Sequence, residues 1–171
     1  KKINDNVGIP IIIYNIPSRS VIDMSVNTMS KLYELKNIVG VKDATGDLSR
    51  VDQQLKAMGK EFIQLTGNDD NSLEFNRRGG IGSISVTANI AAKYCSNFQI
   101  ACANNFNKAE ELDKVLQPVH NAMFIESNPS PVKYAASLLG MCNPSVRLPL
   151  VEVKDETKKK ISEALKVAKL L

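Results

Sequence analysis

The chain has 171 residues, of which 43% are hydrophobic and 23% are charged, a composition typical of a globular domain and unlike that of a disordered chain. No apolar stretch approaches the roughly 20 residues that a membrane-spanning helix needs. The 22 basic and 18 acidic residues are interspersed. The densest basic run, Lys158–Lys160, has no aromatic neighbours, so we interpret it as a solvated helix face and not as a nucleic-acid site.

The cysteines and the single histidine limit the chemistry further. Cys95, Cys102 and Cys142 are odd in number and show no C-x-x-C spacing, which predicts free thiols in a reducing cytoplasm. His120 is the only histidine and lies in a helical pattern, so we expect it to serve packing or the surface. A His-rich metal site is therefore not expected.

Four short runs rich in isoleucine and valine follow one another in the first part of the chain. They read "GIPIIIYN" (8–15), "IVGVKD" (38–43), "EFIQLTG" (61–67) and "GSISVTAN" (82–89). None alternates cleanly between apolar and polar residues, which is typical of strands covered on both faces.

Helical patterns separate these runs. Ser25 is placed to cap a helix after the first run, and Asp47 to cap one after the second, with Gly59 at its end. Strands separated by helices need crossover connections and are therefore parallel. Such a β-α alternation fits either half of an eightfold barrel or a small doubly wound sheet.

From about residue 106 the strand patterns cease. The stretch "NKAEELDKVLQPVHNAMFIES", a shorter helix after "NPSP" and a last helix from near Asp155 are predicted there. We therefore expect two parts, an α/β part over 1–105 and a helical part over 106–171.

The carboxyl ends of parallel strands are where α/β proteins place their chemistry. Lys42 ends the second predicted strand, where an amine in a partly dry pocket loses its proton more readily, because desolvation disfavours the ammonium form. A neutral amine attacks carbonyl carbons and forms Schiff bases. The alternative is a structural ion pair with Asp43, which is disfavoured because neighbours on a strand point to opposite faces.

Tyr14 and Arg19 follow the first predicted strand and should lie at the same edge. A phenol at this position could relay protons to a bound carbonyl compound, and a guanidinium could bind a carboxylate through two hydrogen bonds. The alternatives are a half-buried aromatic residue and a solvated loop arginine. The glycines of "GGIGS" (79–83) resemble a phosphate cradle, but they precede a strand, so packing and turn geometry explain them better.

Five segments in order resemble the dihydrodipicolinate synthase branch of the pyruvate-dependent class I aldolases, which share a (β/α)8 barrel. They are "YNIPSRS" (14–20), "GVKDATGD" (40–47), "LTGND" (65–69), "GGIGSISVTAN" (79–89) and "NPSPVKYA" (128–135). Because they run from one end of the chain to the other in the family's order, the resemblance is specific.

The resemblance implies a role for each of five residues. Lys42 would form the Schiff base with pyruvate, and Tyr14 would relay protons. Arg19 would hold the carboxylate of the second substrate, aspartate semialdehyde. Gly67 would leave room beside the imine, and Ile84 would contact pyruvate through its backbone.

The resemblance also implies a fold, a metabolic pathway, a cellular compartment and an oligomeric state. It begins late in the family's fourth β-α unit, so we expect the fold to be the C-terminal half of a (β/α)8 barrel, strands 5–8, followed by the helical part. We expect lysine and diaminopimelate biosynthesis in the cytoplasm, a homotetramer, no nucleic acid or membrane partner, and no cofactor beyond the lysine imine.

Two other functions stay open at this point. Another pyruvate-dependent aldolase, such as N-acetylneuraminate lyase, shares the tyrosine and lysine motifs, although Arg19 favours the synthase. A half-barrel leaves strand edges unpaired, so we expect the chain to be inactive alone. A non-catalytic half-barrel fragment is the second alternative.

Overall fold

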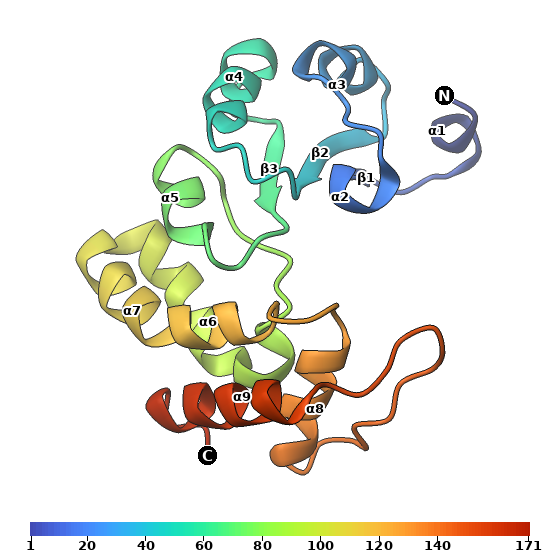
Figure 1. The fold of residues 1–171 in the computed structure, drawn as a ribbon. Helices are drawn as coiled ribbons and strands as arrows, with labels where there is room; N and C mark the ends of the chain where they lie inside the picture. The colour runs from blue at the N-terminus through green and yellow to red at the C-terminus, as the bar shows by residue number, and fades with distance from the viewer. The chain divides into compact units, whose positions relative to one another are not determined.

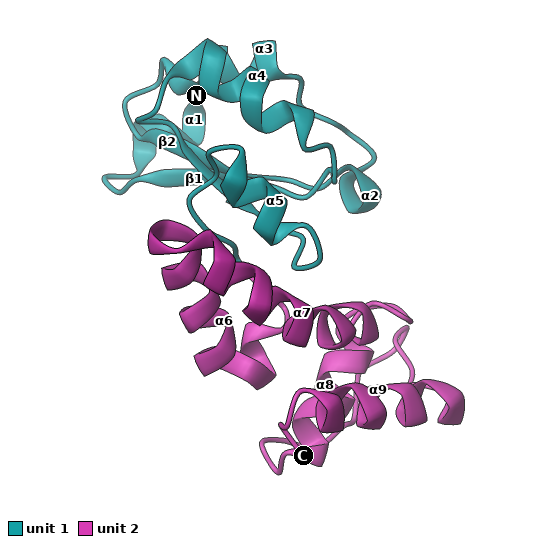
Figure 2. Cartoon of the chain, turned by 90° about the vertical axis from the view of Figure 1, so that its left-hand side faces the viewer, with its two compact units in different colours: residues 1–84 teal, residues 85–171 magenta.

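The computed structural model describes residues 1–171 and divides into two compact units, unit 1 (Lys1–Ile84) and unit 2 (Ser85–Leu171), shown in Figure 2. The sequence predicts a division at 105/106 instead. The boundary lies earlier because helix α6 (Ala88–Asn104) packs against later helices of unit 2.

Unit 1 is built on a parallel sheet of three strands in the order β1-β2-β3. The strands are β1 (Ile11–Asn15), β2 (Ile38–Asp43) and β3 (Ile63–Thr66). The helices of unit 1 are α1 (Lys2–Asn6), α2 (Pro17–Ser20), α3 (Val26–Tyr33), α4 (Ser49–Met58) and α5 (Ser72–Arg77). Three parallel strands joined through helices confirm the predicted β-α alternation for the first three runs.

Helices α3 and α4 lie together on one face of this sheet (Figure 1). Met29, Val41 and Phe62 form the buried centre of that layer, and the ring of Tyr33 meets Phe62 edge to face at 5.0 Å. On β1 the side chains alternate, so that Ile13 packs into this layer while Tyr14 is 47% exposed on the other face. The sheet therefore has one helix-covered face and one open face.

The fourth predicted strand is not formed, and this overturns the predicted half-barrel of four strands. In the segment 82–89 only Ser83 pairs with β3, through an isolated parallel bridge to Thr66. The chain then turns, because the Ser85 hydroxyl accepts a hydrogen bond from the Ala88 N–H at 2.9 Å and α6 begins there. The segment therefore makes a single bridge to β3 and no strand before α6 begins at Ala88.

Local capping signals explain where α3 and α4 begin and end. The Ser25 hydroxyl accepts a hydrogen bond from the Thr28 N–H at 3.1 Å, as predicted. Asp47 accepts bonds from the N–H and the hydroxyl of Ser49 at the start of α4. The hydrogen bonds from the Ser49 hydroxyl and N–H lower the pKa of the Asp47 carboxyl, and the nearby charge of Arg50 lowers it further. Gly59 ends α4 with a φ of 79°, a conformation that favours glycine.

Unit 2 is a cluster of four helices, α6, α7 (Phe106–Ala122), α8 (Ser130–Leu138) and α9 (Asp155–Val167). Its core includes the fully buried side chains of Val119, Met123, Ile161 and Leu165. The sole histidine is buried in unit 2, where its Nδ1 lies 2.7 Å from the Thr87 hydroxyl. None of the helices has the length and apolar character required to traverse a bilayer.

Gly40 sits where β2 and β3 approach each other, which generates a first prediction. An added Cβ would fall against the carbonyl oxygen and the Cβ of Ile63, so Gly40→Ala should lower the free energy of unfolding by about 1–3 kcal/mol, as overpacking does. Urea unfolding followed by circular dichroism measures it. Gly8→Ala is the matched control, because nothing lies within 4 Å of its added Cβ. Equal stability of the two variants would contradict the packing described for these strands.

Candidate active site

Tyr14 and Lys42 meet at the carboxyl ends of neighbouring strands. The parallel register pairs Tyr14 of β1 with Lys42 of β2, so both side chains stand on the open face of the sheet. The Lys42 Nζ lies 3.9 Å from the centroid of the Tyr14 ring. This contact places the amine beside the phenol.

Gly67 leaves the space next to the Lys42 side chain open. Its N–H donates to the Asp43 carbonyl at 2.7 Å, which draws the chain after β3 against the end of β2. A Cβ added there would lie 3.0 Å from the Lys42 Cε and 2.8 Å from the Ala44 Cβ. Any side chain at this position would therefore crowd the lysine.

Asp43 does not serve as the ion-pair partner of Lys42. It lies on the helix-covered face, where its Oδ2 accepts from the Arg50 Nε at 2.9 Å and from the Gln54 Nε2 at 3.2 Å. Its Oδ1 accepts from the N–H and the hydroxyl of Thr45. This arrangement removes the structural alternative considered for Lys42, since the carboxylate is satisfied on the opposite face.

Arg19 and Ile84 lie in unit 1 with the other three predicted residues. Arg19 lies in the short helix α2, directly after β1, and its side chain is exposed. Ile84 donates its N–H to the Thr66 carbonyl at 3.0 Å and is 46% exposed. Its carbonyl is therefore the backbone group that a ligand could use.

A set of polar residues behind the open face was not predicted from the sequence. Asn15 and Asp43 each follow a predicted site residue directly, and both are almost fully buried. They are connected through Asp23 and Arg50, which lie on the β1–α3 loop and on α4. The sequence did contain a signal for Asn15 and Asp43. Each follows a residue that points to the open face, so its own side chain must point to the opposite, helix-covered face.

The glycines at 79–80 serve packing, as expected. A Cβ on Gly80 would collide with the Phe75 ring, and Gly79 has a φ of 114° that favours glycine. The tight turn after α5 therefore explains both residues without a phosphate.

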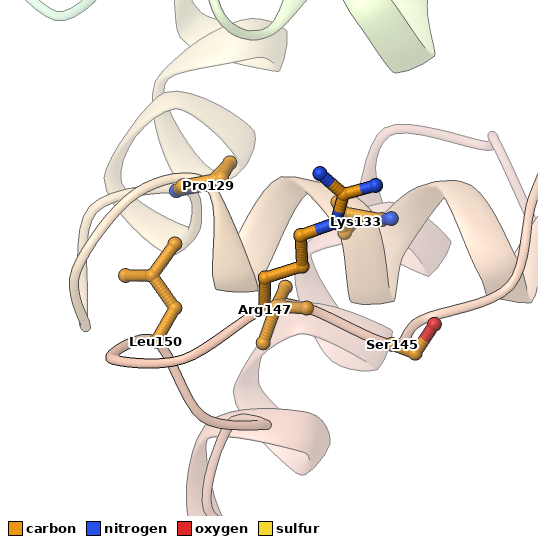
Figure 3. A pocket seen from close by; sticks show the side chains of 6 residues that line it. Pro129, Lys133, Ser145, Arg147 and Leu150 are labelled. Carbon is orange, nitrogen blue, oxygen red and sulfur yellow. The ribbon is translucent and has the colours of Figure 1, made fainter.

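A separate pocket of about 550 Å³ lies in unit 2 (Figure 3). Lys133 and Arg147 line it together with apolar side chains and Ser145. It contains none of the five predicted residues. The candidate site is therefore the open face of the sheet in unit 1.

Comparison with known proteins adds an independent finding. The sequence profile described as the Dihydrodipicolinate synthetase family matches residues 1–168. The 4-hydroxy-tetrahydrodipicolinate synthase of Pelagibacter ubique is 70% identical over 175 residues, which cover 100% of this chain and 60% of that protein. The enzyme of the same name from Parvibaculum lavamentivorans is 52% identical and is covered to 59%.

The solved structures that match this chain include enzymes described as dihydrodipicolinate synthases. The dihydrodipicolinate synthase of Aquifex aeolicus matches with a TM-score of 0.95 at 40% identity, covering 99% of this chain and 59% of that one. The chloride-inhibited enzyme of Acinetobacter baumannii, complexed with pyruvate, matches with a TM-score of 0.95 at 37% identity, with the same coverage.

The chain thus spans about 60% of the length of its relatives. The expected fold class, a C-terminal half-barrel made of strands 5–8, is wrong on two counts. The matched share exceeds half, and the sheet holds three parallel strands where four are predicted.

The buried pair behind the site generates a second prediction. Arg50→Ala leaves the Asp43 carboxylate buried without its cation, which should cost about 3–5 kcal/mol of unfolding free energy. Chemical denaturation of the purified chain measures it. Arg78→Ala is the matched control, because its ion pair with Asp52 is exposed and the change should be small. If both variants unfold at the same denaturant concentration, the pair does not support the strand ends.

Proposed function

Because the chain belongs to the dihydrodipicolinate synthetase family, we propose that it carries the imine-forming lysine of a 4-hydroxy-tetrahydrodipicolinate synthase. The observation that carries the proposal is the half-buried amine of Lys42, held 3.9 Å from the centroid of the Tyr14 ring at the end of β2. The enzyme would be a lyase of the class I aldolase type, acting in lysine and diaminopimelate biosynthesis.

Lys42 is the nucleophile in this proposal. Its neutral amine attacks the keto carbon of pyruvate, and loss of water leaves an imine. A proton then leaves the pyruvate methyl group, and the resulting enamine carbon attacks the aldehyde carbon of aspartate semialdehyde, whose oxygen takes up a proton. The imine serves as the electron sink, so this chemistry calls for no further cofactor.

The neighbouring residues take the remaining roles. Tyr14 relays the protons of imine formation and condensation, because its phenol belongs to the residue paired with Lys42. Gly67 keeps room for the imine beside the lysine Cε. The Ile84 carbonyl faces the bound keto acid, and the Arg19 guanidinium holds the carboxylate of aspartate semialdehyde by two hydrogen bonds.

The relatives support pyruvate as the first substrate, since the matching Acinetobacter baumannii structure is a complex with pyruvate. We also propose a homotetramer in the cytoplasm. None of Cys95, Cys102 and Cys142 forms a disulfide, which supports a reducing compartment, and the tetramer follows the family resemblance.

The lysine assignment gives a third prediction. Residues 1–171 are placed in a chimera in which they replace the matching segment of the Pelagibacter ubique relative, because the chain spans only 60% of that protein. Incubation with pyruvate followed by borohydride should attach the reduced adduct to Lys42, as located by peptide mass spectrometry. The 171-residue chain alone should show little or no turnover.

Two controls make that result decisive. Lys42→Arg keeps the charge but cannot form the imine, so it should give no adduct. Lys133, a half-buried lysine of unit 2, should stay unmodified in the same digest. An adduct spread over several lysines, or none on Lys42 in an active chimera, would refute the proposal.

Arg19 gives a fourth prediction, which separates the synthase from an aldolase with another acceptor. Arg19→Ala should lower kcat/KM for aspartate semialdehyde about 10- to 100-fold, the value of a lost charge-assisted hydrogen bond. The rate of borohydride trapping with pyruvate should change far less. Arg19→Lys should fall between the two, because a lysine keeps the charge without the planar fork. Equal loss of both steps would remove the assigned role.

A further inference from the structure

We propose that Asn15, Asp23 and Arg50 form a clamp that positions the β1–α3 loop (residues 16–25), and with it Arg19, against the strand ends. This inference rests on the proposed function for the role of Arg19, although the clamp itself can be tested without it. The three residues are positioning residues, since they act through Arg19.

The loop is closed at its base by a single buried side chain. Asn15, 1% exposed, donates through its Nδ2 to the Asp23 Oδ1 at 2.8 Å. Its Oδ1 accepts from the Met24 N–H at 3.2 Å. The amide thus joins the last residue of β1 to the far end of the loop that leaves it.

Arg50 connects this closure to the second strand. Its Nη2 donates to the Met24 carbonyl at 2.7 Å, and its Nη1 lies 3.6 Å from the Asp23 Oδ1. Its Nε donates at 2.9 Å to Asp43, the residue after Lys42. A planar guanidinium with several donors can make these contacts together, whereas a lysine could not.

The strands complete the connection. Asn15 pairs with Asp43 in the parallel register, and the Ala44 N–H donates to the Asn15 carbonyl at 2.9 Å. The residues that anchor the clamp are therefore the sequence neighbours of Tyr14 and Lys42, on the opposite face. A displacement of the loop would have to break contacts made directly behind both site residues.

Inside the loop, the chain is held in an unfavourable conformation. Val21 has a φ of 65°, a left-handed conformation that β-branched residues rarely adopt, and its N–H donates to the Pro17 carbonyl at 2.9 Å. The Ser20 hydroxyl lies 2.9 Å from the Ile16 carbonyl and 3.0 Å from the Ile22 carbonyl and can donate its proton to either. Such strain persists only where the surroundings fix the backbone, and the clamp supplies that constraint.

Asp23 is the best residue to test, because its side chain is 50% exposed and its removal leaves the core in place. In the 171-residue chain, Asp23→Ala should raise the rate of trypsin cleavage after Arg19 about tenfold, as local opening of the loop requires. Cleavage after the exposed Lys60 of the same unit should not change. A parallel rise at both sites, or no rise after Arg19, would overturn the clamp.

Two matched variants sharpen the result. Asp23→Asn keeps an oxygen that can accept from Asn15, so cleavage after Arg19 should stay within about twofold of the parent chain. Asp52→Ala removes an exposed carboxylate that lies outside the clamp and should leave that rate unchanged. Cleavage after Arg19 that rises equally in Asp23→Asn and Asp23→Ala would refute the hydrogen-bond basis of the clamp.

The positioning role needs a kinetic readout in the chimera described above. Asp23→Ala should raise KM for aspartate semialdehyde about fivefold or more, with little change in borohydride trapping of pyruvate at Lys42. An unchanged KM would refute the positioning of Arg19. If the parent chimera fails to trap pyruvate, the proposed function fails, whereas the protease result still decides whether the clamp exists.

Discussion

The alternation of side chains along two paired strands is the constraint on which the candidate site depends. Tyr14 and Lys42 share one register position and stand on the open face, while Asn15 and Asp43 share the next and point into the helix-covered face. A shift of β2 by one residue in this register would turn Lys42 toward the helix-covered face and Asp43 toward the open face. The amine and the polar anchor on this strand would then exchange environments.

This alternation also explains how a lysine and an aspartate can be neighbours in sequence without forming an ion pair. Arg50, itself buried, neutralises Asp43, and hydrogen bonds from Thr45 and Gln54 satisfy the rest of the carboxylate. Burial of charge is tolerated only under such conditions. The amine of Lys42 lies on the other face of the sheet instead, 3.9 Å from the centroid of the Tyr14 ring.

The sequence predicted what local patterns and motifs determine. Three β-α units, the Ser25 cap and the glycine that ends α4 follow from short-range rules, and the motif around Lys42 led to the correct family. The prediction of a fourth strand was wrong. A strand needs a neighbouring strand to pair with, and the pattern of apolar residues does not show whether one is present. Arg50 was missed for the same reason, since its contacts with Asp43 and Met24 join residues far apart in the chain.

The two parts of the site are held by forces of different kinds. Tyr14 and Lys42 belong to strands fixed by backbone pairing, whereas the Arg19 loop is tied to them by the side chains of Asn15, Asp23 and Arg50. The hydrogen bonds between strands join backbone groups, whereas the clamp loses a contact when one of its side chains is replaced. A substitution in the clamp can therefore displace the Arg19 loop while Tyr14 and Lys42 keep their places on the paired strands.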